Sequence, residues 1–207
     1  KKVLLLEKHN IPGGCATSFI RGRFKFEVAL HQLSGMGSKE KPGPLRSILK
    51  KLEVEDKIDW VEIENQYRTI VPGKLDITLP ANKEGSVAVL QKQFPAEKEN
   101  IQRFFDMTYR YILEWLGLTR TPDNDVNREK FPTYFKYNMW TVQEVLGEFF
   151  QDRMLQLVLS FYWSYMGVPP ERLSFDPVAM CIVGYIEFKP YHMKGGSQVM
   201  SVALTET

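Results

Sequence analysis

The sequence feature that most constrains the fold is a continuous apolar run, Val3-Leu4-Leu5-Leu6, which is followed by Glu7. Successive side chains of a strand point to opposite faces, so an all-apolar strand is typical of a parallel sheet covered on both faces. Such sheets occur in α/β domains. We therefore expect the chain to open with a buried strand, followed by a turn at Pro12-Gly13-Gly14.

Glu7 stands where dinucleotide-binding βαβ units place an acidic residue, at the end of a strand. There, a carboxylate accepts hydrogen bonds from both ribose hydroxyls of the adenosine. Gly13 and Gly14 would let the backbone approach a cofactor, because neither residue carries a Cβ. Alternatively, Glu7 only ends a strand and the glycines only turn the chain. The spacing alone leaves both interpretations open.

The composition narrows the classes of function. A formal net charge of +2 provides no strong field to attract nucleic acid, although 43% hydrophobic residues allow a sizeable core. Cys15 and Cys181 match neither a disulfide framework nor a zinc site, which favours a reducing, cytoplasmic setting. His9, His31 and His192 lack the spacing of metal ligands, so we expect no metal site.

Several segments after the first turn have the pattern of β-structure. Apolar and charged residues alternate over 23–28, which predicts a half-buried strand, and a second strand is predicted over 60–64. The segments 67–71 and 74–79 flank Pro72-Gly73, a dipeptide suited to a type II turn, and predict a hairpin. We expect these later strands to form an insertion, not further Rossmann sheet.

The remaining segments have helical patterns. Thr141-Val-Gln-Glu144 is a capping box that opens a helix. Residues 154–170 are uncharged and apolar on all sides, which predicts one enclosed helix, slightly shorter than the roughly 20 residues that cross a bilayer. Asp176-Pro177 predicts a helix from Pro177. The predicted helices cover 45–52, 101–116, 141–150, 155–166, 177–185 and 198–207.

With these motifs in place, the sequence resembles a known family. Residues 6–19 and 22–31 resemble the FAD-binding segment of the phytoene desaturase, carotenoid isomerase and retinol saturase group, within the amine-oxidase-like flavoproteins. Residues 162–170 and 191–196 resemble substrate-domain signatures of the same group. Cys15, Phe19 and His31 resemble the retinol saturase branch more than the desaturases.

The resemblance implies an α/β (α+β) chain with a partial Rossmann-type FAD domain and a mixed β/helical substrate-binding cap. The implied division is residues 1–40 for the FAD domain, 41–190 for the cap and 191–207 for a return toward the FAD domain. The implied activity is that of an FAD-dependent oxidoreductase on carbon–carbon double bonds of a hydrophobic polyene, and contact with a membrane would be peripheral.

The resemblance also assigns residues. Glu7 would bind the adenosine ribose, and Lys8, Gly13, Gly14 and Cys15 would lie along the cofactor. The residues assigned to flavin or substrate contact are His31, Tyr162, Tyr191 and His192, and each is alternatively a structural residue. Cys15 is either a reactive thiol or, as we expect, a small buried filler. Gly195-Gly196-Ser197 either binds an anion or, as we expect, admits close packing.

One departure from the group is that no G-x-G-x-x-G turn lies in these residues, although it should precede Glu7 by two to three dozen residues. Both ends look cut within elements, and we expect these residues alone to bind FAD poorly. Two other interpretations stay open. One is an amine-oxidase-like flavoenzyme, and the other is a catalytically silent lipid-binding or interaction fragment.

Overall fold

The computed structural model describes residues 4–206, apart from the side chain of residue 124, and divides into two compact units. Unit 1 combines the described residues up to Glu64 with those from Phe188 onward, and unit 2 spans Asn65–Glu187. The expected boundary between residues 40 and 41 differs from this division, because residues 41–64 pack within unit 1. The mixed α/β fold class is confirmed.

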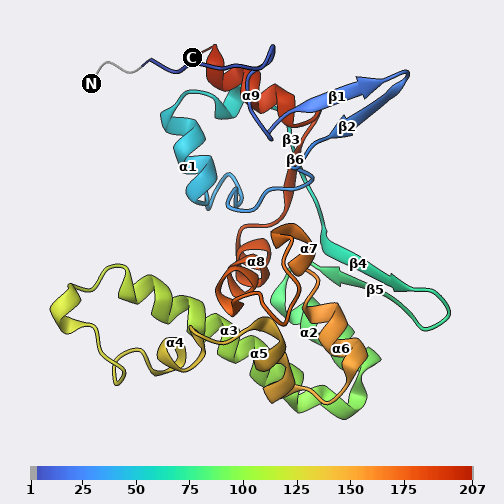
Figure 1. Cartoon of the computed structure of the whole chain (residues 1–207), viewed down its shortest axis with the longest axis vertical. Helices are drawn as coiled ribbons and strands as arrows, with labels where there is room; N and C mark the ends of the chain where they lie inside the picture. The colour runs from blue at the N-terminus through green and yellow to red at the C-terminus, as the bar shows by residue number, and fades with distance from the viewer. Residues whose placement is uncertain (1–3, 207) are drawn as a thin grey trace. The chain divides into compact units, whose positions relative to one another are not determined.

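Unit 1 is built from short elements around a small core (Figure 1). Strands β3 and β6 pair antiparallel, with Val61 opposite His192, and β1 and β2 form a separate hairpin. The core gathers Met36, Leu49 and Met193 with a few other buried side chains. The elements are β1 (Ser18–Arg21), β2 (Phe24–Glu27), α1 (Pro44–Lys51), η1 (Glu55–Lys57), β3 (Trp60–Glu62), β6 (Tyr191–Met193) and α9 (Ser197–Thr205).

A buried ion pair stabilises unit 1. Arg46 of α1 pairs with Glu55, and both side chains are almost completely buried. The Arg46 guanidinium also donates to the backbone oxygens of Met36 and Gly37, each at 3.2 Å. These bonds compensate for taking two charges out of water, and they fix the loop that precedes α1.

Unit 2 is a hairpin followed by helices. At the hairpin turn, Gly73 has a φ of 71° and the Lys74 N–H donates to the Val71 oxygen at 2.9 Å, which confirms the expected turn. The elements are β4 (Asn65–Val71), β5 (Leu75–Pro80), α2 (Lys83–Gln93), η2 (Pro95–Glu97), α3 (Lys98–Leu118), η3 (Asp123–Asp125), α4 (Pro132–Tyr137), α5 (Val142–Phe149), α6 (Arg153–Leu159), α7 (Trp163–Met166) and α8 (Phe175–Glu187).

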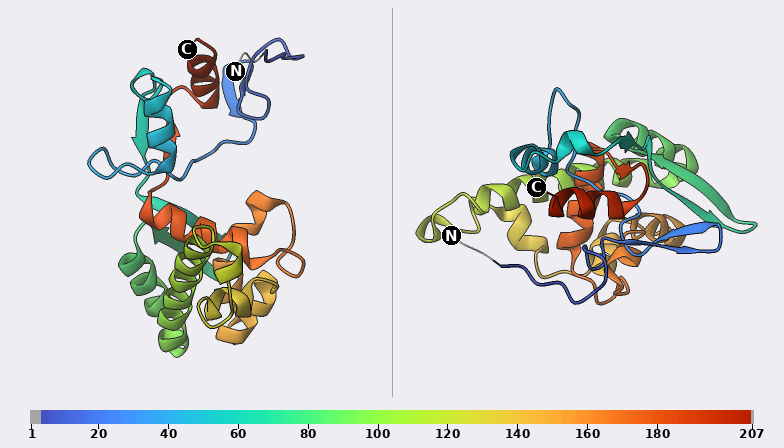
Figure 2. Two further views of the ribbon diagram at one scale, coloured as in Figure 1. Left: turned by 90° about the vertical axis from the view of Figure 1, so that its left-hand side faces the viewer. Right: turned by 90° about the horizontal axis from the view of Figure 1, so that it is seen from above.

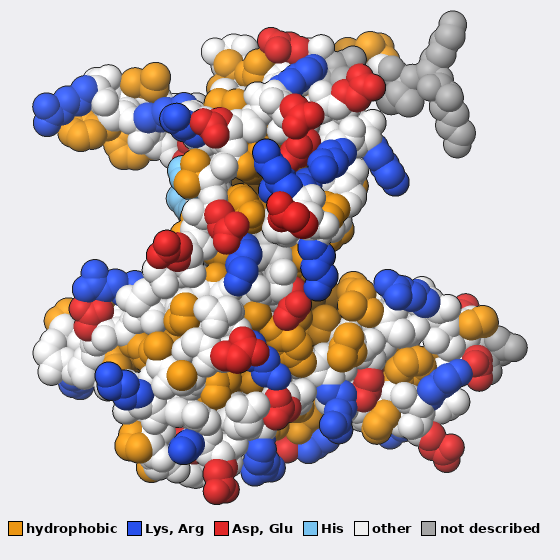
Figure 3. All heavy atoms as spheres, turned by 180° about the vertical axis from the view of Figure 1, so that it is seen from behind, with side chains coloured by type: hydrophobic (Ala, Val, Ile, Leu, Met, Phe, Trp, Pro, Cys, Tyr) orange, Lys and Arg blue, Asp and Glu red, His pale blue; other side chains and the backbone are white. Residues whose placement is uncertain are grey.

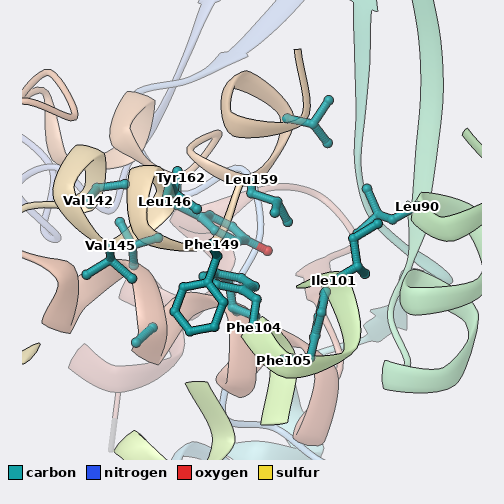
Figure 4. Packing of buried hydrophobic residues seen from close by; sticks show 14 of the residues in the cluster. Leu90, Ile101, Phe104, Phe105, Val142, Val145, Leu146, Phe149, Leu159 and Tyr162 are labelled. Carbon is teal, nitrogen blue, oxygen red and sulfur yellow. The ribbon is translucent and has the colours of Figure 1, made fainter. Parts of the chain in front are cut away.

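The helices of unit 2 enclose a large aromatic and aliphatic core (Figure 4). Phe104 of α3 lies at its centre, with its ring 5.6 Å from that of Phe149 and 5.3 Å from that of Phe150. The Thr141 hydroxyl and the Glu144 carboxylate form the expected capping box at the start of α5. Helix α3 keeps the predicted apolar face, with Ile101, Phe104 and Phe105 buried.

The chain was expected to open with a strand, and this strand was expected to be buried. Both expectations were wrong. Val3 lies outside the described residues, and Leu4, Leu5 and Leu6 form no strand and are 81% to 87% exposed. Within residues 4–206 all strand pairs are antiparallel, so no parallel neighbour orders or covers these leucines.

The strand predicted over 23–28 forms as β2, but it is not half-buried. Phe24, Phe26 and Val28 are 44% to 58% exposed, and Phe26 stacks on Phe19 of β1 at 5.1 Å. Hydrophobic and basic side chains therefore share the surface of this hairpin (Figure 3). Among the described residues nothing covers these apolar side chains, so alternation predicted the strand but not its burial.

The single helix predicted across 154–170 is also wrong. The chain forms α6 and the one-turn α7, which ends at Gly167 with a left-handed φ of 66°. Leu157, Trp163 and Tyr165 are more than 40% exposed, so the segment is not enclosed on all sides. Helix α8 begins at Phe175, two residues before the expected start. No helix in the described part of the chain is long and apolar enough to cross a membrane.

Candidate cofactor site

The segment assigned to the cofactor lies on the surface of unit 1. Glu7 and Lys8 are both exposed, and the Glu7 Oε1 atom accepts a hydrogen bond from the backbone N–H of His9 at 2.8 Å. This bond uses Oε1 and holds the carboxylate beside its own turn, while the side chain as a whole stays exposed to solvent. Glu7 can therefore still accept hydrogen bonds from a ligand.

The two glycines of the loop are required for different reasons. A Cβ on Gly13 would lie 2.4 Å from the Ser201 Oγ and 2.7 Å from the Ala16 oxygen, so Gly13 admits close packing against α9. Gly14 has a left-handed φ of 57° and nothing within 4 Å of a Cβ position. Gly13 is therefore needed for close packing, and its contact with a cofactor stays a prediction, whereas the backbone at Gly14 is open to a ligand.

Helix α9 holds this glycine loop in place (Figure 2). The Ser201 hydroxyl donates to the Ala16 oxygen at 2.5 Å, and the Gln198 amide donates to the Pro12 oxygen at 3.0 Å. Within the loop, the Ala16 N–H donates to the Gly13 oxygen at 2.8 Å. The loop is thus ordered from its inner side while Gly14 and Cys15 remain exposed.

Glu27 of β2 occupies the N-terminus of α9. Its carboxylate accepts from the Ser197 N–H at 3.0 Å and from the Ser18 hydroxyl at 2.7 Å. Burial raises the pKa of Glu27, but hydrogen bonds from Ser197 and Ser18 and the charge of Lys25 outweigh burial and place the pKa below its ordinary value. A Cβ on Gly196 would lie 2.2 Å from this carboxylate, which supports the close-packing interpretation of Gly195-Gly196-Ser197.

The other candidates in unit 1 gather around β6. Leu33 lies opposite Tyr191 in an antiparallel bridge, so the segment that carries the exposed His31 runs beside β6. Tyr191 is buried and donates to Glu62 Oε2 at 2.7 Å. Burial and this carboxylate raise the pKa of Tyr191 to about 12. His192, the next residue, is half-buried.

Tyr162 lies in the core of unit 2. Its side chain is fully buried, its hydroxyl donates to Gln66 at 3.1 Å, and its ring stacks on Tyr185 at 5.5 Å. Burial raises the pKa of the Tyr162 hydroxyl. These contacts favour the structural interpretation of Tyr162, and its role toward a substrate stays a prediction.

Cys15 corrects another expectation, because it is exposed and is not a buried filler. It follows two glycines with positive φ, so it sits on the outer side of the loop that α9 supports from within. Cys181 is the more buried thiol, and burial raises its pKa to about 11. No group of three or more metal-ligating residues occurs among the described side chains.

A separate pocket of about 440 Å³ opens beside β3 and β6. Acidic residues are the commonest type in its wall, which also has Trp60 and Tyr191 as aromatic members and includes the Arg46–Glu55 pair. Tyr191 is the one sequence-predicted site residue in this lining, and Glu7 and the glycine loop contribute nothing to it.

Sequence reasoning missed Glu27, Ser18 and Ser201 as residues that shape this site. A local signal for Glu27 existed: α9 starts at Ser197 after two glycines and has no acidic residue in its first turn. A helix start of that kind needs an anion or acceptor from elsewhere in the chain. Which distant residue provides it could not be read from the sequence.

Comparisons with known proteins show what the chain is similar to. A family model described as NAD(P)-binding Rossmann-like domain matches residues 1–52. All-trans-retinol 13,14-reductase of Danio rerio is 24% identical over 213 residues, covering 96% of this chain and 34% of that protein. The human protein of the same name is 23% identical over the same length. Prolycopene isomerase 1 of an Oncidium hybrid cultivar is 32% identical over 162 residues, 78% of this chain and 24% of that protein.

These matches confirm the resemblance to the retinol saturase and carotenoid isomerase group. The chain spans about a third of the length of the retinol reductases and about a quarter of that isomerase. The similarity to the retinol reductases extends through both units, and the Rossmann-like match is confined to unit 1.

Proposed function

We propose that this chain is part of an FAD-dependent oxidoreductase that acts on carbon–carbon double bonds of a hydrophobic polyene, by saturation, desaturation or isomerisation. One observation carries the proposal: similarity to proteins named for retinol reduction covers 96% of the chain, and its first residues match a Rossmann-like domain. The exposed carboxylate of Glu7 and the open backbone of Gly14 support a dinucleotide in the matched segment.

The described residues fit one side of a dinucleotide site. Glu7 would accept hydrogen bonds from the adenosine ribose through the oxygen that does not bind His9. Lys8 would add a positive charge near the cofactor, the backbone at Gly14 would approach it without a steric barrier, and the exposed Cys15 would lie beside it. FAD, when bound, would supply the redox chemistry, and the protein would supply orientation and electrostatics.

The proposed contacts with the substrate involve two parts of the chain, β6 of unit 1 and the apolar side chains of unit 2. Tyr191 and His192 lie on β6, beside the segment that carries His31, and we propose that this edge of unit 1 faces the flavin or the substrate. Unit 2 would contribute the apolar cap. A substrate of this kind partitions into bilayers, which supports peripheral membrane contact.

The first test is the flavin content of the full-length gene product. We expect the purified protein to carry FAD and Glu7→Ala to weaken FAD binding about tenfold to a hundredfold, because hydrogen bonds to a charged group are lost. Fluorescence titration of the apoprotein measures the affinity. Glu53→Gln, at an exposed position of unit 1, is the matched control. A full-length protein without flavin affinity would overturn the proposal.

The second test separates the polyene from an amine. We expect stopped-flow mixing of the full-length flavoprotein with a polyene to change the flavin oxidation state, and mixing with amines to leave it unchanged. Reduction by an amine without any reaction with a polyene would favour the amine-oxidase alternative.

A further inference from the structure

Three distant segments of unit 1 meet at the first turn of α9. They are the glycine loop of residues 12–18, strand β2 through Glu27, and the Gly195-Gly196 turn. Glu27 binds the glycine loop through the Ser18 hydroxyl, and it accepts from the N–H of Ser197, the residue that directly follows the Gly195-Gly196 turn. Lys25, on the same strand, donates to the Gly195 oxygen. The Glu27 carboxylate therefore bonds a residue that lies 170 positions further along the sequence.

The start of α9 needs this carboxylate. The N-cap residue is Gly196, which makes no side-chain cap bond, and the first turn has no acidic residue. The free N–H groups at a helix N-terminus carry a partial positive charge that favours an anion. Glu27 supplies that anion from β2, so the chain itself fills the position where an external anion would otherwise bind.

Glycine at position 196 makes room for the carboxylate. A Cβ there would lie 2.2 Å from Glu27 Oε1 and 2.7 Å from the Ser18 Oγ, and its φ of 88° disfavours other residues. The need for glycine in the Gly195-Gly196 turn is therefore explained by the space that the Glu27 carboxylate occupies, and no phosphate group has to be assumed.

The same contact supports the loop that carries Gly14. Ser18 ends the loop and binds Glu27, while Ser201 and Gln198 of α9 bind the backbone at Ala16 and Pro12. We infer that Glu27 is a positioning residue for the proposed dinucleotide site: its carboxylate locks the glycine loop and the Gly195-Gly196 turn onto α9 and pre-orders the backbone at Gly14. The cofactor part of this inference rests on the proposed function.

The experiment compares the wild type with Glu27→Gln, which preserves the shape but not the charge, and with Glu53→Gln as the control. In the 207-residue chain, hydrogen exchange is measured over residues 12–18 and 197–201. We expect Glu27→Gln to speed exchange there by about tenfold or more, with unit 2 unchanged. In the full-length apoprotein, we expect it to weaken FAD binding about three- to tenfold, because a pre-ordered loop loses less entropy on binding.

A rescue experiment distinguishes the charge from simple packing. In Glu27→Ala, we expect sodium formate to restore slow exchange over residues 12–18, because formate can take the vacated place at the α9 N-terminus. Sodium chloride at the same ionic strength should not restore it. Fast exchange that formate fails to restore would assign the effect to lost packing and overturn the electrostatic role.

The remaining outcomes separate this inference from the proposed function. If Glu27→Gln leaves loop exchange unchanged, the inference is wrong. Suppose that the wild type binds FAD and that Glu27→Gln speeds loop exchange but does not change the FAD affinity. Glu27 then holds the loop on α9 without any role in cofactor binding, and the proposed function stands. If the full-length wild type binds no FAD, the proposed function fails and the exchange data alone decide the lock.

Discussion

The two units stabilise their folds by different means. Unit 2 buries a continuous cluster of aromatic and aliphatic side chains from all its longer helices and its hairpin. Unit 1 buries only a small cluster and relies on polar contacts, chiefly the Arg46–Glu55 pair and the bonds around Glu27. The comparison shows that a hairpin with exposed phenylalanines can still be held to its neighbours by a few charged groups, provided each is hydrogen-bonded.

The largest expected effect is on the core of unit 2. Phe104→Ala should destabilise that unit by about 4 kcal/mol, because it removes a buried ring and leaves a cavity among Phe149, Phe150 and Phe175. Hydrogen exchange during urea titration measures each unit separately. Leu113→Ala, at an exposed position on the same helix, is the control. Equal destabilisation of unit 1 would contradict the assignment of this effect to the core of unit 2.

Arg46→Ala tests the polar mode of stabilisation in unit 1. We expect a loss of about 3 kcal/mol there, because Glu55 is left buried without its partner. Denaturant unfolding followed at Trp60, whose indole donates to the Glu55 backbone, reports the change. The double variant Arg46→Met with Glu55→Leu should recover most of the loss. Failure to recover would show that the bonds to Met36 and Gly37 matter more than the charge.

Acid should destabilise each unit partly by protonating a hydrogen-bonded carboxylate, that of Glu27 in unit 1 and that of Glu97 in unit 2. Burial raises the pKa of Glu97, but hydrogen bonds from Asn100, Asp152 and Gln151 outweigh burial and lower the pKa below the ordinary 4.5. The pKa of Glu27 is lowered in the same way, by hydrogen bonds that outweigh burial. Each carboxylate therefore stabilises its unit fully above about pH 4.5 and stops doing so as the pH falls through its folded-state value.

Glu97→Gln should cost unit 2 about 2 kcal/mol at neutral pH, because the acceptor for two backbone N–H groups loses its charge. Its stability should then depend less on pH than that of the wild type below pH 4.5. Denaturant midpoints measured from neutral to acid pH provide the check, and Glu99→Gln, an exposed neighbour, is the control. Parallel pH profiles for wild type and Glu97→Gln would refute the assignment.

The smallest expected effect is at the capping box. Thr141→Ala should destabilise unit 2 by about 1 kcal/mol, because the Glu144 N–H loses its acceptor at the start of α5. Thr119→Ala, at an exposed hydroxyl beyond α3, should cost less. Thermal unfolding detects the difference, and a larger loss than for Phe104→Ala would reverse the ranking.

Local features were predictable from the sequence because neighbouring residues encode them. Pro72-Gly73 specified its turn, and Thr141 with Glu144 specified a helix start. Burial was less predictable. The spacing of Phe24, Phe26 and Leu157 shows which residues share one side of a strand or helix. It does not show whether another layer covers that side. The prediction for Leu4–Leu6 failed for this reason.

The candidate site was predictable only in part. Glu7 and Gly14 were identified from a short motif, whereas the partners of Glu27 lie at the far end of the sequence. The Arg46–Glu55 ion pair was also missed. Arg46 lies in a helix with other charged residues, and no periodic pattern in the sequence distinguishes the buried charge from the exposed ones. Long-range polar contacts depend on the tertiary fold, and the pattern of a single sequence does not specify them.

The bond between Glu27 and Ser197 also bears on when unit 1 can fold. Unit 2 is one uninterrupted stretch that ends at Glu187, and its contacts are all available once that residue has been synthesised. Unit 1 needs residues from both sides of that stretch, since β3 pairs with β6 and Glu27 with the start of α9. During synthesis, the β1–β2 hairpin can close by itself, but β3 and the glycine loop must wait for β6 and α9, and we expect closing this long loop to be the slower step.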